Sequence, residues 1–156
     1  MAKNANRYWW LLSIPAILLI AKKIKGMPTT KKQLTKNFAR SEFDSHDGAV
    51  MPDDVQKNII ELAVNLQVLR DKVNSTIKIN SGYRSPAWNK KVGGVQDSQH
   101  VLGKAADIVV QGFTPIEIAQ TIEALIAAGK MKQGGIGIYP NFVHYDVRGT
   151  KARWRA

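Results

Sequence analysis

The chain has 156 residues with 44% hydrophobic content, which suits a single domain with a core of its own. It contains no cysteine, so disulfide frameworks, thiolate metal sites and cysteine nucleophiles are excluded. The net charge of +11 belongs to an N-terminal arm, because residues 1–40 hold nine Lys or Arg and no acidic residue. This distribution favours an anionic lipid surface over nucleic acid as a partner, and we expect no nucleic-acid binding.

An uncharged run at residues 8–21 lies between basic residues of this arm. It is shorter than the roughly 20 residues of a full membrane span, but it begins with tryptophans and is followed by lysines, which are typical of membrane interfaces. We therefore predict a membrane anchor in residues 1–26, which contacts the bilayer through residues 8–21, and a linker over residues 27–37. A cleaved signal peptide and an interfacial or partner-binding helix are the alternatives.

The first half of the remaining chain predicts a helix and then a strand. Residues 53–73 carry apolar side chains three and four apart, which form one apolar stripe, and Pro52 precedes two aspartates at the predicted helix start. Residues 76–80 alternate like a strand and lead into a turn at residues 81–84. Residues 88–99 contain several Gly and Asn residues and are predicted to form a loop.

The second half predicts a buried strand, a helix and a hairpin. Residues 105–110 are apolar apart from one aspartate, which indicates a buried strand with a single carboxylate. Residues 114–117 form a capping box that starts a helix ending at Gly129. Residues 136–139 and 142–147 are predicted to be two strands of a hairpin. The expected fold is therefore α+β, with a small antiparallel sheet and two main helices, preceded by an apolar N-terminal helix.

Three residues of this half make a candidate zinc site. His100 and His144, two of the chain's three histidines, and Asp107 form a three-ligand set. Catalytic zinc sites keep three protein ligands and leave the fourth position to water. A carboxylate buried in an apolar strand is costly unless it is paired, and a metal would remove that cost. The alternative for Asp107 is a salt bridge to Arg84 or Arg148.

The motif Ser98-x-His100-x-x-Gly103-x-Ala105-x-Asp107, with a later strand that carries His144, resembles the zinc D-Ala-D-Ala carboxypeptidase family of metallopeptidases. The wider group includes lysostaphin-type endopeptidases and the zinc domain of hedgehog proteins. The resemblance covers residues 38–156, and other matching segments are residues 81–86, residues 134–139 and Arg153-Trp154. It implies that His100, Asp107 and His144 bind one Zn²⁺ in a peptidase domain over residues 38–156.

The resemblance also implies how substrate is held. It places Arg84 in contact with the substrate, often with its carboxylate, and a guanidinium suits that geometry. Ser98 is expected to hydrogen-bond the substrate or Asp107, and Tyr139 to contribute to the substrate cleft. Trp88 and Trp154 are further candidates for the cleft, but core packing is the favoured role for at least two of Trp88, Tyr139 and Trp154. His46 lacks metal-ligand spacing and is predicted to be an exposed loop histidine.

A general base is also needed, and here the chain departs from related subfamilies. They carry an acid where this chain has Asn141, or a histidine where it has Phe142. Asp146 remains, two residues after His144 and on the same face of the strand. It is either the base or the group that orients His144. Asp146 and Arg84 are the predicted catalytic residues.

The predicted function is zinc-dependent hydrolysis of peptide bonds in peptidoglycan, as a D,D-carboxypeptidase or an endopeptidase. The domain would face the cell wall from a membrane anchor, in the periplasm or outside the cell, and act in bacterial wall remodelling. It would be virion-associated, or a lysis enzyme, if a phage encodes it. The alternative is a non-catalytic zinc protein that binds peptidoglycan or has a structural role at the membrane.

Overall fold

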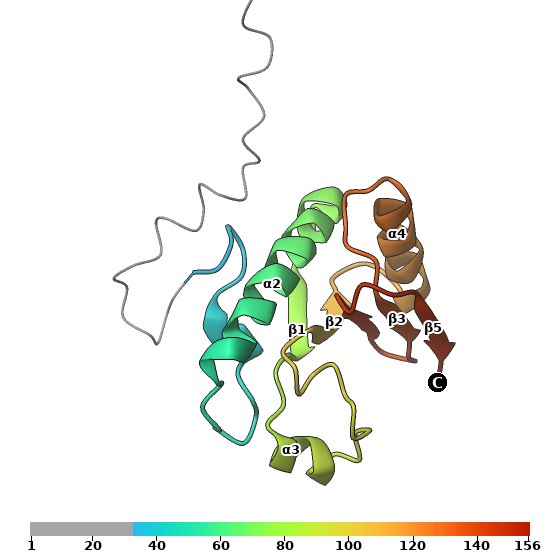
Figure 1. Ribbon diagram of the computed structural model, residues 1–156. Helices are drawn as coiled ribbons and strands as arrows, with labels where there is room; N and C mark the ends of the chain where they lie inside the picture. Colours follow the sequence, from blue (N-terminus) through green and yellow to red (C-terminus); the bar gives the residue numbers. More distant parts are fainter. Residues whose placement is uncertain (1–32) are drawn as a thin grey trace, which may run out of the picture.

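The computed structural model describes residues 33–156, so the predictions for residues 1–26 and for part of the linker lie outside this part (Figure 1). Within residues 33–156, no helix is long and apolar enough to cross a bilayer. The elements in chain order are η1 (Arg40–Phe43), α2 (Asp53–Val73), β1 (Ile77–Ser81), α3 (Pro86–Lys91), β2 (Ala105–Val110), α4 (Pro115–Ala127), β3 (Gly135–Ile138), β4 (Val143–Asp146) and β5 (Ala152–Arg155).

The two main helices form where apolar periodicity, for α2, and a capping box, for α4, predict them. The buried side chains of α2 repeat along one stripe and face the sheet. Helix α4 begins with the predicted capping box, in which the Thr114 side chain accepts from the Glu117 backbone and the Glu117 carboxylate accepts from the Thr114 N–H at 2.7 Å. It ends before Gly129, whose φ of 66° lies in the left-handed region that favours glycine.

The sheet has the strand order β1-β2-β4-β3-β5 and is mixed. Four strands pair antiparallel as predicted, but β5 pairs parallel with β3, so the expectation of a purely antiparallel sheet was wrong. The reason is topological. Strands β3 and β4 form the predicted hairpin, the chain reverses once more after β4, and β5 then pairs along the free edge of β3.

A short helix replaces part of the predicted loop at residues 88–99. Helix α3 (Pro86–Lys91) forms because Ser85 caps it, with the Ser85 Oγ accepting from the Trp88 N–H at 3.0 Å, and because Pro86 stands at the first helical position. Asn89 then fixes the loop that follows, since its side-chain amide donates to the Val95 carbonyl at 2.9 Å.

The two faces of the sheet differ in chemistry. On one face, apolar side chains pack against α2 and α4, and both helices lie on this side (Figure 1). The sheet contributes the following side chains to this core: Ile77, Ala106, Ile108, Val110, Ile136, Val143 and Tyr145. Because side chains alternate along a strand, the residues between them point to the opposite face, which carries the polar side chains of the site.

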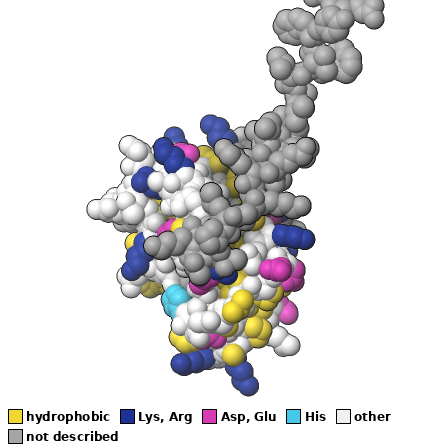
Figure 2. Space-filling view, turned by 90° about the vertical axis from the view of Figure 1, so that its left-hand side faces the viewer, with side chains coloured by type: hydrophobic (Ala, Val, Ile, Leu, Met, Phe, Trp, Pro, Cys, Tyr) yellow, Lys and Arg dark blue, Asp and Glu magenta, His cyan; other side chains and the backbone are white. Residues whose placement is uncertain are grey.

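The surface of the described residues carries Lys and Arg side chains in several separate places. Figure 2 shows them around the edge of one face, with acidic and hydrophobic side chains between them. This dispersal agrees with the near balance of fourteen basic and twelve acidic residues in residues 41–156.

Candidate metal centre

The site is built on one row of residues that crosses all five strands. Register pairs join Ser81 to Asp107, Asp107 to His144, His144 to Gly137 and Gly137 to Trp154. Directly paired residues project their side chains from the same face of a sheet. The register therefore places Asp107, His144 and Trp154 side by side on the face opposite the helices.

Three ligand atoms converge at this row. The Asp107 Oδ1 lies 3.2 Å from the His100 Nε2 and 3.0 Å from the His144 Nδ1, and the two ring nitrogens are 3.2 Å apart. All three side chains are buried, and together they form a group that could hold a metal ion. Atoms bound about 2.0–2.1 Å from a tetrahedral zinc lie about 3.3 Å from one another, so the observed separations fit zinc.

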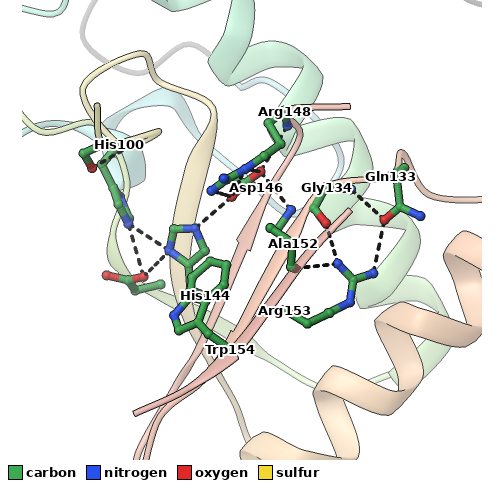
Figure 3. Close-up of polar contacts among 12 residues, drawn as sticks. His100, Gln133, Gly134, His144, Asp146, Arg148, Ala152, Arg153 and Trp154 are labelled. Atoms are coloured by element: carbon green, nitrogen blue, oxygen red, sulfur yellow. Dashed lines mark hydrogen bonds and ion pairs between the residues drawn. The ribbon is translucent and has the colours of Figure 1, made fainter. Parts of the chain in front are cut away.

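The hydrogen bonds behind the two imidazoles set their tautomers. The His100 Nδ1 lies 2.7 Å from the Gly82 carbonyl, which can only accept, so this nitrogen carries the proton. The His144 Nε2 lies 3.1 Å from the Asp146 carboxylate (Figure 3), which assigns the proton to Nε2 in the neutral ring. In a neutral imidazole the other nitrogen is an acceptor. Two lone pairs and a carboxylate oxygen therefore face one another, and only a cation between them would bind all three.

The pKa shifts of the three candidate ligands agree with a cation bound between them. Burial holds the pKa of His100 below its usual value, although Asp107 opposes this effect, so the ring is neutral as a metal ligand must be. Burial alone would lower the pKa of His144, but Asp107 and Asp146 outweigh it and raise the pKa. Burial alone would raise the pKa of Asp107, but both histidines outweigh it, so the pKa is lowered and the carboxylate stays ionised.

Asp146 is completely buried behind His144 and is saturated with donors. Besides His144, its carboxylate accepts from the Gly135 N–H at 2.9 Å, from the Arg148 N–H at 3.1 Å, and from the Arg148 Nε and Nη2 (Figure 3). These hydrogen bonds outweigh the effect of burial and lower the pKa of Asp146. A Cβ at residue 135 would lie 2.3 Å from the Asp146 carboxylate, which explains the glycine there.

Arg84 pairs with a ligand of the site. Its Nη2 donates to the Asp107 Oδ2 at 2.5 Å, and its Nε donates to the Ser81 Oγ at 2.8 Å. Of the two salt bridges considered for Asp107, the one to Arg84 is therefore present, whereas Arg148 pairs with Asp146. A salt bridge to Arg84 and a place among the candidate metal ligands are compatible roles for Asp107, because its Oδ2 contacts Arg84 and its Oδ1 faces the histidines.

A cleft of about 730 Å³ lies over the three ligands. Its walls include Arg84, Ser98 and Tyr139, the three residues predicted to contact substrate, together with residues 92–97, Phe142, Arg148 and Trp154. Ser98 is buried, and its Oγ accepts from the His100 N–H at 3.3 Å, so it supports the ligand turn and does not bond Asp107. His46 is exposed, 5.9 Å from the Trp88 ring, and outside the cleft, as expected.

One wall of the cleft is aromatic. Tyr139 stacks on Phe142 with ring centroids 4.3 Å apart, and the Tyr139 hydroxyl accepts from the Trp154 Nε1 at 3.1 Å. The Trp154 ring lies 5.1 Å from the His144 ring. Gly137 makes room for it, because a Cβ there would lie 2.4 Å from the indole. Trp154 therefore belongs to the cleft and not to the core.

Strand β5, which carries Trp154, is held by Arg153. The Arg153 guanidinium pairs with Glu123 on α4 and donates to the Gly134 carbonyl at 2.5 Å and the Gln133 side chain at 3.1 Å (Figure 3). These contacts tie the last strand to the segment before β3. The two residues of the Arg153-Trp154 segment therefore have different roles. Arg153 anchors the strand, and Trp154 lines the cleft.

Sequence reasoning missed Arg148 as part of the site. It considered this residue only as a partner of Asp107, whereas the structure places it on Asp146 and in the cleft wall. The sequence signal that could have identified Arg148 was its position two residues after Asp146, the last residue of β4. Sequence reasoning also missed Gly82, whose carbonyl orients His100.

The chain belongs to the Peptidase M15 family, whose model matches residues 31–146. This finding confirms the family to which the sequence motifs point. The protein is therefore a member of a peptidase family, and its α+β fold carries two histidines and one aspartate that could hold a metal ion.

Two curated proteins are similar to this chain. One is the "Probable peptidoglycan L,D-endopeptidase MepK" of Haemophilus influenzae, 30% identical over 105 residues, which are 63% of this chain and 53% of the relative. Another is the "Zinc D-Ala-D-Ala carboxypeptidase" of Streptomyces albus G, 34% identical over 77 residues, which are 47% of this chain and 30% of the relative. The chain therefore matches about half the length of the first and under a third of the second.

Proposed function

We propose that this protein is a zinc-dependent peptidase that hydrolyses peptide bonds in peptidoglycan. The observation that carries the proposal is the convergence of three acceptor atoms, from His100, Asp107 and His144, beneath an open cleft. Membership of the Peptidase M15 family supports peptide hydrolysis, and the names of the two similar proteins support zinc and a peptidoglycan substrate. Both a carboxypeptidase and an endopeptidase occur among these names.

In this proposal His100, Asp107 and His144 hold the ion and the cleft holds the peptide. A bound zinc lowers the pKa of its water to about 7 and polarises the scissile carbonyl. The chain supplies the orientation of the ligands. Gly82 fixes His100, Arg84 neutralises and fixes Asp107, and Asp146 fixes His144. Arg84 and Tyr139 line the cleft, which supports their predicted contact with substrate.

We assign Asp146 to positioning and not to proton transfer. A general base needs to reach the proton that it removes, directly or through one water. Asp146 is 0% exposed, does not line the cleft, and already accepts from His144, Gly135 and Arg148. Of the two roles considered from the sequence, orientation of His144 is the one that these contacts favour.

The test is digestion of purified peptidoglycan by the full-length chain. We expect zinc-loaded protein to release peptide or amino-acid products, chelator to stop the release, and added zinc to restore it. Release of single D-amino acids would identify a carboxypeptidase, and loss of cross-linked fragments an endopeptidase. Binding to peptidoglycan without any hydrolysis by zinc-loaded protein would instead indicate the non-catalytic alternative.

We further propose that residues 8–21 hold the domain at a membrane facing the cell wall. The uncharged run and its basic flanks support this role, since lysine stems can extend along the bilayer while their charges reach the headgroups. Together with the proposed substrate, this arrangement would place the cleft next to the wall in the periplasm or outside the cell.

The anchor predicts where the protein is found after cell fractionation. Carbonate-washed membranes should retain the full-length chain, because burial of the apolar run does not depend on salt or pH, and should release a form that begins at residue 27. Mass analysis of the retained protein distinguishes an anchor from a cleaved signal peptide. Full-length protein of unchanged mass in the soluble fraction would contradict the proposal.

A further inference from the structure

Two guanidinium groups border the three ligands, and they are not equivalent. Arg84 lies next to Asp107, and Arg148 lies beyond His144, next to Asp146. Both line the cleft. The Arg148 side chain is 31% exposed and that of Arg84 17%, so Arg148 offers more of its surface to a ligand.

The carboxylates paired with these arginines also differ in position. Asp107 lines the cleft beside Arg84, so an anion that approaches Arg84 meets another negative group. Asp146 is completely buried and does not line the cleft, although it neutralises Arg148 in part. Since repulsion between like charges falls with distance, and Asp107 stands in the cleft wall whereas Asp146 does not, Arg148 is the better place for an anion.

Arg148 is also held in a fixed orientation. Its Nε donates to both Asp146 oxygens at 2.9 and 3.0 Å, its Nη2 donates to Oδ2 at 2.7 Å, and its backbone N–H donates to Oδ1 at 3.1 Å. The guanidinium carbon lies 5.9 Å from the centroid of the Trp154 ring, and both side chains line the cleft. Its Nη1 donates to no atom of residues 33–156. The hydrogen bonds to Asp146 therefore use the Nε–Nη2 edge of the guanidinium and leave Nη1 unbonded within these residues.

We infer that Arg148 is the anion-recognition residue of the cleft and binds a carboxylate of the substrate peptide. A guanidinium with one edge fixed by Asp146 and the other edge open binds a carboxylate through charge-assisted hydrogen bonds at little entropic cost. The inference rests on the proposed peptidase function. It assigns to Arg148 the carboxylate contact that the sequence resemblance implies for Arg84, whose Nη2 is engaged by Asp107.

The location also suggests which carboxylate is bound. Asp146 contacts both Arg148 and the ligand His144, so one side chain separates the guanidinium from a ligand of the proposed metal. A carboxylate there lies near the bond to be cut, as the C-terminal carboxylate of a short peptide does in a carboxypeptidase. A carboxylate on an internal residue of the stem peptide has the same chemistry, so the experiment needs to separate the two.

The test compares acid and amide forms of one peptide on the zinc-loaded, full-length protein. The substrate is an N-acetylated tripeptide that ends in D-alanyl-D-alanine, as the free acid and as the C-terminal amide. A second pair carries Glu or Gln at an internal position. The wild type should prefer the acid of one pair by about 10- to 150-fold in kcat/KM, the range of one charge-assisted contact. Arg148→Gln should abolish that preference, because turnover of the acid should fall by about 10- to 150-fold more than turnover of the amide.

The matched control is Arg155→Gln, which removes an exposed guanidinium from the same C-terminal segment but outside the cleft, and it should retain the preference. If Arg148→Gln lost zinc or failed to fold, Arg148→Lys would replace it, and its preference should fall because lysine cannot present a planar edge. Equal loss of turnover on acid and amide would overturn the inference, since Arg148 would then only position Asp146. Absence of a preference in both pairs would overturn it as well.

A binding measurement separates this inference from the proposed function. Calorimetry with N-acetyl-D-alanyl-D-alanine needs no turnover, and we expect about 10-fold or greater weakening in Arg148→Gln and no change in Arg155→Gln. If zinc-loaded wild type hydrolysed no peptide, the proposed function would fail while this binding difference still supported Arg148. Equal affinity of wild type and Arg148→Gln for this peptide and also for the Glu-containing peptide of the second pair, or no binding of either peptide to either protein, would overturn the assignment.

Discussion

Replacing His100 with alanine should leave the protein with less than half an equivalent of zinc and abolish hydrolysis of peptidoglycan. His100 supplies one of three ligand atoms, and the described residues place no other His or carboxylate in that group. Two remaining protein ligands hold zinc weakly, because catalytic sites ordinarily use three. Metal analysis of the purified variant measures the first effect, and product release from peptidoglycan the second.

His46→Ala is the matched control for this experiment. It also removes a histidine, but His46 is exposed and lies beside Trp88, away from the three ligands. We expect one equivalent of zinc and unchanged activity. Full zinc content in His100→Ala, or equal loss of zinc in both variants, would show that the ion is held elsewhere.

Replacing Asp146 with asparagine should weaken both the fold and the metal site. The Asp146 carboxylate accepts from His144, Gly135 and Arg148, and an asparagine would turn its NH₂ group toward at least one of these donors. Breaking one side of a buried ion pair costs about 3–5 kcal/mol. We expect the lower part of that range, because Arg148 remains 31% exposed and can reach water. Urea unfolding of chelator-treated protein measures this loss.

The same substitution separates the two roles considered for Asp146. If Asp146 orients His144, zinc affinity should fall by about 10- to 100-fold, and excess zinc should restore much of the activity. If it were the general base, the rate should fall by about 100-fold or more with zinc affinity intact. Competition titration against a chelator measures the affinity. The control Asp54→Asn, at an exposed position near the start of α2, should change neither quantity.

The secondary structure was largely predictable because local rules decide it. The bounds of α2 were predicted from the spacing of apolar residues, and the start of α4 from its capping box. Helix α3 was missed because the Gly and Asn residues in residues 88–99 led to the prediction of a loop, although Ser85 and Pro86 form a helix-start signal. Strand β5 was not predicted, since a four-residue edge strand owes its form to its partner β3 and not to its own sequence.

The candidate ligand set was predicted from the few histidines of the chain and from the resemblance of its motifs to a zinc peptidase family. A chain without cysteine and with three histidines offers few combinations, and the motif around His100 and Asp107 narrowed them further. The structure brings the three predicted ligand atoms within 4.8 Å of one another. The roles of the arginines were not predictable in this way, because a guanidinium reaches several carboxylates and only the packing decides which one it meets.

The sequence by itself determined the peptidase family, the main helices and the candidate zinc ligands. Each depends on residue types at fixed separations along the chain. Only the tertiary structure decided that Arg84 pairs with Asp107, that Asp146 is closed off from the cleft, and that Arg148 is open to it. These properties depend on strand register, which aligns residues distant in sequence on one face of the sheet, and on burial, which sets what each charged group can reach.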